Sequence, residues 1–191
     1  FYTRDIMQNK ICDKKMSFEE CELAVLRSAI DKAEERDKSK AISPQIKEMI
    51  QIVEQFLRDE RCICYGGTAI NNLLPKREQF YNYDEEVPDY DFFSPNPIEH
   101  ATKLVDLYVK AGYEEVEAKS GVHYGTYKVY VNFIPMADIT LLEKSLFDVL
   151  LENSKKKLGI YYCPPNYLRM SMYLELSRPK GDISRWEKVL K

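Results

Sequence analysis

The run Pro-Asp-Tyr-Asp-Phe-Phe-Ser at residues 88–94 most constrains what this chain can fold into. Side chains at positions i and i+2 of a β-strand point to the same face, so Asp89 and Asp91 would be aimed at one place. Tyr90 and Phe92 would point to the opposite face, where a hydrophobic core can anchor the strand. Mg²⁺ binds to one or two carboxylates together with substrate phosphates. We therefore predict a metal-binding strand here, although an isolated Asp-x-Asp also occurs in solvated turns.

A glycine pair upstream predicts a phosphate-binding turn. Gly66 and Gly67 follow a short apolar strand expected at residues 62–65 and precede a helix expected to run from Thr68 to Leu74. Glycines let backbone N–H groups approach a triphosphate closely, and the start of a helix adds partial positive charge. The Thr68 hydroxyl could cap this helix or bind a phosphate oxygen. We therefore predict that Gly66, Gly67 and Thr68 bind a nucleotide.

A third acid, Asp138, lies downstream in the apolar run at residues 133–140. The sequence thus contains, in order, a phosphate-binding turn, a pair of acids and a third carboxylate. These are the groups that two-metal phosphoryl or nucleotidyl transfer requires. We favour a role as metal ligand for Asp138. It could also act as a general base, or cap a neighbouring turn at the end of its strand.

The residues of these motifs resemble those of a known superfamily. The glycine pair, the Asp-x-Asp strand and the later acid are similar to the polymerase-beta-type nucleotidyltransferases. Within that superfamily, residues 64–72 and 89–94 resemble the poly(A) polymerase catalytic subunits of large nucleocytoplasmic DNA viruses, as do residues 170–179 and 185–187. Two departures stand out: Thr68 replaces the more frequent Ser, and members of this family are usually longer, with a second, degenerate nucleotidyltransferase-like domain.

This resemblance implies an α+β polymerase-beta-like nucleotidyltransferase fold, with a small mixed sheet backed by helices and further helices at the N-terminus. It also implies template-independent addition of AMP from ATP to RNA 3′ ends, with Mg²⁺ or Mn²⁺ as cofactor. Asp89 and Asp91 would hold both cations, and Asp138 would complete the site that activates the RNA 3′-hydroxyl. A homodimer is a further expectation, as is a location in the virion or the host cytoplasm.

We expect three segments: N-terminal helices over residues 1–60, a nucleotidyltransferase core over 61–160, and a helical segment over 161–191 that leads into a further domain. Both ends of the sequence look like cuts in a longer protein. An amphipathic pattern with Ser17 as N-cap predicts a helix to about residue 35. Ser43 and Pro44 predict the start of a second helix.

The spacing within the core predicts one more helix and several strands. Residues 96–99 resemble a capping box that opens a helix ending near Ala111. Residues 113–118, 126–133 and 136–140 alternate as strands do, with a bulge expected at Pro135 because proline cannot donate to a ladder. His123 is expected in a turn between two of these strands. The chain beyond Thr140 is expected to be helical.

Composition excludes several other classes of protein. No run of apolar residues is long enough for a membrane span, so we expect no membrane partner. Five cysteines without metal-ligand spacing indicate a reducing compartment, and two histidines make a zinc site improbable.

Residues 151–191 carry nine Lys or Arg against four Asp or Glu, a net of +5 in a chain of net charge −3. This end could follow RNA phosphates through Arg169, Lys180 and Arg185, whereas Lys155–Lys157 could equally be a solvated helix end.

The residues that recognise the base are not determined by the sequence. Any of seven tyrosines could stack on adenine or RNA, although core packing is the more common role of tyrosine: Tyr124, Tyr127, Tyr130, Tyr161, Tyr162, Tyr167 and Tyr173.

Two other functions remain open. One is a nucleotidyltransferase that acts on tRNA or a small molecule, and the other is an inactive copy of the fold used for binding or assembly. Retention of all three acids disfavours the inactive copy.

Overall fold

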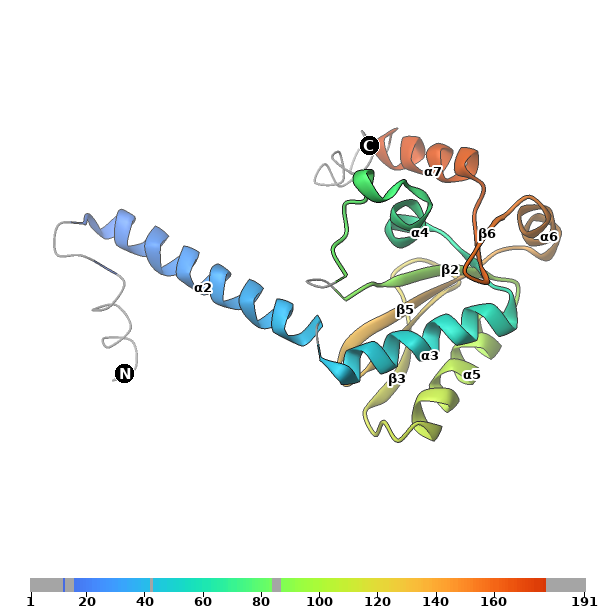
Figure 1. Cartoon of the computed structure of the whole chain (residues 1–191), viewed down its shortest axis with the longest axis horizontal. Helices are drawn as coiled ribbons and strands as arrows, with labels where there is room; N and C mark the ends of the chain where they lie inside the picture. The colour runs from blue at the N-terminus through green and yellow to red at the C-terminus, as the bar shows by residue number, and fades with distance from the viewer. Residues whose placement is uncertain (1–11, 13–15, 42, 84–86, 178–191) are drawn as a thin grey trace.

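The protein forms one seven-stranded mixed sheet with helices on both faces (Figure 1). The structure is a computed structural model that describes residue 12 and residues 16–41, 43–83 and 87–177 of the chain. The strands are β1 (Ile63–Cys64), β2 (Tyr90–Ser94), β3 (Val116–Ser120), β4 (Thr126–Val131), β5 (Ile134–Leu141), β6 (Lys155–Lys157) and β7 (Ile160–Tyr162). The helices are α2 (Phe18–Ala41), α3 (Pro44–Glu60), α4 (Gly66–Leu73), α5 (Pro97–Lys110), α6 (Lys144–Glu152) and α7 (Pro165–Ser177), with a 3₁₀ turn η1 (Lys76–Glu78).

The strand order is β3-β4-β5-β2-β1-β7-β6. The central strand β2 pairs in parallel with β5 and antiparallel with β1, and β1 pairs in parallel with β7. Helices α3 and α5 cover one face of this sheet, and α4 and α7 lie on the other (Figure 1). The expected mixed sheet backed by helices is therefore confirmed.

The hydrophobic core lies between the sheet and the helices α3 and α5. Phe92 of β2, Val129 of β4 and Ile139 of β5 are fully buried there. Phe56 of α3 packs against Phe92 with ring centroids 5.9 Å apart. Tyr108 of α5 is also fully buried, and its hydroxyl donates a hydrogen bond of 2.9 Å to the carbonyl of Met49, so it ties the two helices together. This face fixes the strands that carry the candidate site on their other side.

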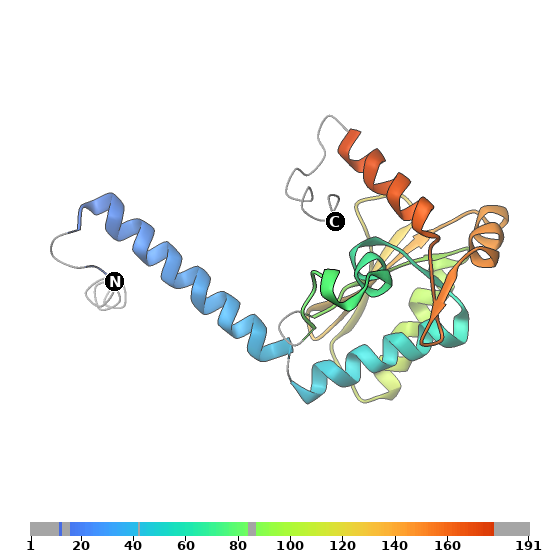
Figure 2. The same cartoon turned by 45° about the horizontal axis from the view of Figure 1, so that its top comes forward.

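The two N-terminal helices begin where the sequence predicts. Ser17 forms a capping box with Glu20: the Glu20 N–H donates to the Ser17 hydroxyl over 3.3 Å, and the Ser17 N–H donates to the Glu20 carboxylate over 2.8 Å. Ser43 caps α3 by accepting from the Ile46 N–H over 3.2 Å. Helix α3 packs on the sheet, whereas α2 projects away from it and exposes Phe18 (Figure 2). Helix α2 also runs beyond the expected residue 35, to Ala41.

Several expected elements are shifted or wrong. The chain beyond Thr140 is not all helical, because Lys155–Lys157 and Ile160–Tyr162 form the β6–β7 hairpin. Residues 96–99 form no capping box, since the Asn96 side chain makes no cap bond in this part of the structure and Glu99 pairs with Lys103 instead. The bulge at Pro135 is confirmed by a register shift opposite Tyr130. Lys180 and Arg185 lie outside the described residues.

The cysteines fall into two groups. The structure joins Cys12 and Cys21 by a disulfide, and it leaves three thiols free and buried, those of Cys62, Cys64 and Cys163. The reducing compartment stays a prediction. Among the described residues, no helix is both long and apolar enough to cross a membrane.

Candidate active site

The acids of β2 and β5 lie side by side on one face of the sheet. In the parallel pairing of these strands, Asp91 is the register partner of Asp138. Their neighbours Phe92 and Ile139 are also register partners and point to the opposite face, into the core. Asp89 precedes β2 by one residue and reaches the same side. The period-two alternation read from the sequence is therefore what places these acids together.

All six residues predicted from the sequence line one cavity of about 650 Å³. The three acids form one part of its wall, and the start of α4 forms another. Residues that the sequence did not single out complete the cavity, including the side chains of Lys128, Thr140 and Tyr81.

The glycine pair forms the first turn of α4, so this helix begins two residues earlier than predicted, with Tyr65 as its N-cap. Gly66 has φ +71°, a conformation that favours glycine. A Cβ at Gly66 would also overlap the Asp91 carboxylate, and one at Gly67 would overlap the Tyr81 hydroxyl. The absence of side chains therefore lets the helix start lie directly against Asp91.

Thr68 has a structural contact that the sequence did not indicate. Its side chain is buried, and its hydroxyl donates a hydrogen bond of 2.7 Å to the backbone carbonyl of Asp89. The backbone N–H of Tyr65 likewise donates to the carbonyl of Asp91 over 2.9 Å. These two bonds fasten the start of α4 to the acid-bearing strand. The suggested N-cap role of Thr68 is wrong, and its contact with a phosphate stays a prediction.

Asp138 forms an ion pair with Lys128, its register partner on β4. The Lys128 ammonium bonds to Oδ2, while the buried Oδ1 has no hydrogen-bond partner among the described residues. Burial lowers the pKa of Lys128, but the hydrogen bond to Asp138 and the charges of Asp138 and Asp89 outweigh it, so the net pKa is raised. Lys128 therefore carries a positive charge beside the acids.

The pKa of Asp89 is raised well above the usual range of a carboxyl group. Desolvation and the negative charge of Asp138 raise the pKa of Asp89 to about 6, against the opposing charge of Lys128. The residue is nonetheless exposed, so solvent screens part of this effect. Desolvation is the larger cause of this rise and the negative charge of Asp138 is the smaller one, and the positive charge of a cation would oppose both.

The residues suit a divalent cation that arrives with a substrate. In the described ranges, no group of three or more His, Cys, Asp or Glu side chains is arranged so that it could hold a metal ion. Mg²⁺ is commonly held by one or two carboxylates plus substrate phosphates, so a complete protein cage is not required. The unpartnered Oδ1 of Asp138 and the negative charge that Asp138 places beside Asp89 both fit such an ion.

Hydroxyl groups extend the site along the sheet. The Tyr65 hydroxyl lies 2.8 Å from Thr140 Oγ1, which lies 3.0 Å from Thr126 Oγ1. The Tyr65 ring stacks on Phe93 with centroids 4.0 Å apart, so its position is fixed by packing. Burial and the nearby charge of Asp91 raise the pKa of Tyr65, which keeps the hydroxyl protonated.

Asn71 of α4 binds residues 80–83, a segment in which the Tyr81 hydroxyl lies against Gly67. It is fully buried, and its side-chain oxygen accepts from the backbone N–H groups of Phe80 and Tyr81 over 2.8 and 2.9 Å. Its amide donates to the Tyr83 hydroxyl over 3.2 Å, and that hydroxyl donates to Asn72 over 2.8 Å. One buried amide thus places two tyrosines at the cavity.

The functional residues missed in the sequence carry only weak local signals. Lys128 could have been noticed as a charged residue in an otherwise apolar strand, but its partner depends on the register of β4 against β5. Asn71 could have been noticed as a polar residue on the apolar side of a short helix.

The basic side chains of Lys155–Lys157 lie on an edge strand on the far side of β1 from Asp138. Their contact with RNA stays a prediction.

Comparisons with known proteins agree on one family. The family described as poly(A) polymerase catalytic subunit matches residues 51–182. A "Putative poly(A) polymerase catalytic subunit" of African swine fever virus (isolate Pig/Kenya/KEN-50/1950) is 30% identical over 159 residues, which cover 80% of this chain and 33% of that protein. The protein of the same name from Acanthamoeba polyphaga mimivirus is also 30% identical over 159 residues, covering 79% of this chain and 26% of that protein.

A solved structure supports the same fold. The crystal structure of the Megavirus polyadenylate synthase matches with a TM-score of 0.74 and 24% sequence identity, covering 94% of this chain and 37% of that one. This chain spans about a third of the length of the African swine fever virus relative. The family match includes the glycine pair and all three acids, and this chain therefore belongs to the poly(A) polymerase catalytic subunit family.

Proposed function

We propose that this chain carries the catalytic centre of a polynucleotide adenylyltransferase, which adds AMP from ATP to RNA 3′ ends without a template. The observation that carries the proposal is the register pairing of Asp91 with Asp138, beside a helix start that the glycine at position 66 lets lie directly against Asp91. The family match supports the class of reaction.

The residues divide the work between the two substrates. The start of α4 would receive the triphosphate, because its N-cap residue Tyr65 makes no side-chain bond to the backbone N–H groups of the first turn. Asp91 lies directly against this turn, whereas Asp138 lies on the neighbouring strand β5, one strand further along the sheet. The RNA 3′-hydroxyl would therefore approach from the Asp138 side, opposite the triphosphate.

Asp89, Asp91 and Asp138 would hold Mg²⁺ or Mn²⁺. When bound, these ions supply charge neutralisation for the phosphates and lower the pKa of the attacking hydroxyl. Lys128 orients Asp138 through their ion pair, and its ammonium balances part of the negative charge of the three acids. Tyr65 and Thr140 present hydroxyl groups to the same cavity and fix its wall.

The test is primer extension by the full-length protein with ATP, Mg²⁺ and an oligo(A) primer, without a template. Asp91→Asn should lower the rate by about 10³-fold or more, because several kcal/mol of transition-state stabilisation is lost with the ligand. The matched control is Asp106→Asn, an exposed acid of α5 on the opposite face of the sheet. It should extend the primer at the wild-type rate.

Two results would contradict the proposal. The first is undiminished extension by the Asp91→Asn enzyme. The second is a wild-type protein that adenylates tRNA or a small molecule but leaves oligo(A) untouched, which would retain the nucleotidyltransferase class and change the acceptor.

A further inference from the structure

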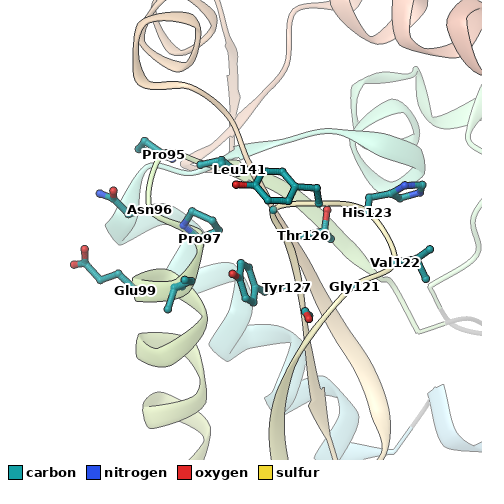
Figure 3. Close-up of a pocket in the computed structure, with 14 residues that line it drawn as sticks. Pro95, Asn96, Pro97, Glu99, Gly121, Val122, His123, Thr126, Tyr127 and Leu141 are labelled. Atoms are coloured by element: carbon teal, nitrogen blue, oxygen red, sulfur yellow. The ribbon is translucent and has the colours of Figure 1, made fainter.

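A second cavity, of about 890 Å³, adjoins the catalytic one (Figure 3). It lies between the start of α5 and the turn that joins β3 to β4. Val122, His123 and Thr126 of that hairpin line both cavities, so the two spaces meet at the turn. The function described above uses the catalytic cavity only.

The lining of the second cavity is aromatic and apolar but open to solvent. Tyr124 is 97% exposed, and Ile98 and Leu141 are 62% and 41% exposed. Tyr127 is half-buried and packs against the core, and Figure 3 shows its ring between Pro97 and the strands of the hairpin. Exposed tyrosines offer flat faces on which nucleic-acid bases can stack. An almost fully exposed tyrosine also contributes nothing to the core, so packing does not explain Tyr124.

The place of this cavity in the sheet assigns it to one of the two substrates. The strand order puts β4 and β5 on one side of β2, whereas α4 contacts β2 at the phosphate-binding turn. Asp138 and Lys128 belong to β5 and β4. The second cavity lies at the end of these two strands, because it is lined by Thr126, two residues before Lys128, and by Leu141, three residues after Asp138.

We propose that this second cavity holds the last nucleotides of the RNA acceptor, with a base stacked on Tyr124. The inference rests on the proposed function and adds the path by which the acceptor reaches Asp138. It separates the two substrates in space: ATP lies on the α4 side of the acids, and RNA passes over the β3–β4 turn.

The charges around the cavity indicate contacts to bases more than to phosphates. The acid on its rim, Glu99, forms an ion pair of 3.0 Å with Lys103, and Figure 3 shows its carboxylate pointing away from Tyr127. RNA is therefore not opposed by a free negative charge at that point. Because stacking does not release counterions, its contribution should persist when salt is added.

The experiment measures KM for an oligo(A) primer and for ATP with the full-length protein and Mg²⁺. Tyr124→Ala should raise the primer KM by about tenfold, as expected when one stacked base is lost, and should leave the ATP KM unchanged. Tyr124→Phe should restore the wild-type value. The matched control is Phe133→Ala, which removes an aromatic ring that is 76% exposed in the turn at the other end of β4. It should change neither KM.

A second measurement separates stacking from charge. The ratio of primer KM between Tyr124→Ala and wild type should be the same at low and high salt. A ratio that collapses with salt would show a phosphate contact and overturn the stacking assignment.

The outcomes are distinct. If the wild-type protein extends RNA and Tyr124→Ala does so with an unchanged primer KM, this inference is wrong and the proposed function stands. If Tyr124→Ala instead changes the oligomeric state in light scattering at an unchanged primer KM, the cavity is a contact between copies of the protein. A wild-type protein that extends no RNA overturns the proposed function and this inference together.

Discussion

The two faces of the sheet are built from the same strands but differ in almost every property. On the face covered by α3 and α5, Phe92, Val129 and Ile139 are fully excluded from water. On the other face, the residues next to them in sequence, Asp91, Lys128 and Asp138, are charged and gather around a cavity. Alternation along a strand therefore lets one segment supply stability and chemistry without mixing them.

This division has a thermodynamic consequence. Buried apolar groups stabilise the fold in proportion to the area removed from water, whereas clustered acids of one sign repel one another when no cation is bound. Truncating a side chain on the face covered by α3 and α5, the dry face, should therefore lower the free energy of unfolding strongly. Neutralising an acid on the opposite face, the charged face, should change the free energy of unfolding little but lower the activity.

The largest expected effect is on the dry face. Phe92→Ala should lower the free energy of unfolding by about 3–5 kcal/mol, because it removes a fully buried ring that packs against Phe56. Asp91→Asn, one residue away, should change it by less than about 1 kcal/mol, since it relieves repulsion and leaves the core intact. Urea denaturation of the metal-free protein measures both. Similar losses in the two variants would break the distinction between the faces.

A smaller effect tests how closely the charged face is fitted together. Gly66→Ala should cost about 1–3 kcal/mol and lower the rate of adenylate addition, because φ is +71° and the new Cβ would displace the Asp91 carboxylate. Gly112→Ala is the matched control: its φ is +93°, but a Cβ there meets no described atom within 4 Å. It should cost stability alone. A fully active Gly66→Ala enzyme would show that the close approach is dispensable.

The smallest expected effect is a pH dependence. The pKa of Asp89 rises from 3.8 to about 6 on folding, so between these values the folded state binds more protons than the unfolded state. Asp89 should therefore make the metal-free protein less stable as pH rises from about 4 to about 6, by less than about 1 kcal/mol because the residue is exposed. Stability measured against pH in EDTA checks this. Asp89→Asn should lack this component, and identical profiles for the two proteins would contradict the assignment.

The sequence was informative where the constraint is local. Alternation in residues 88–94 and in the strand of Asp138 assigned each side chain to a face, and the glycine pair marked a place without Cβ atoms. The caps of α2 and α3 were equally local, because Ser17 and Ser43 bond to N–H groups three residues away.

The rest depends on partners that are distant in the chain. The ion pair of Lys128 with Asp138 requires a particular register between two strands, and the buried amide of Asn71 requires the segment that contains Phe80 and Tyr81. The β6–β7 hairpin was missed because each strand has three residues and β6 is entirely lysine, a composition that suits an exposed sheet edge as well as a helix end. Its turn, at Leu158 and Gly159, uses positive φ at both residues.

The parallel pairing of β1 with β7 also sets the order in which the protein can be completed on the ribosome. The Arg58 guanidinium donates to the Leu158 carbonyl across 100 residues of sequence, and Cys163 donates its N–H to Cys64. Until this late hairpin emerges, the nascent chain carries β1 with one edge unpaired in the middle of its future sheet. Such an edge is a site for pairing with other chains, so a translation product that ends before Cys163 would be prone to aggregation even though every proposed catalytic residue had already been made.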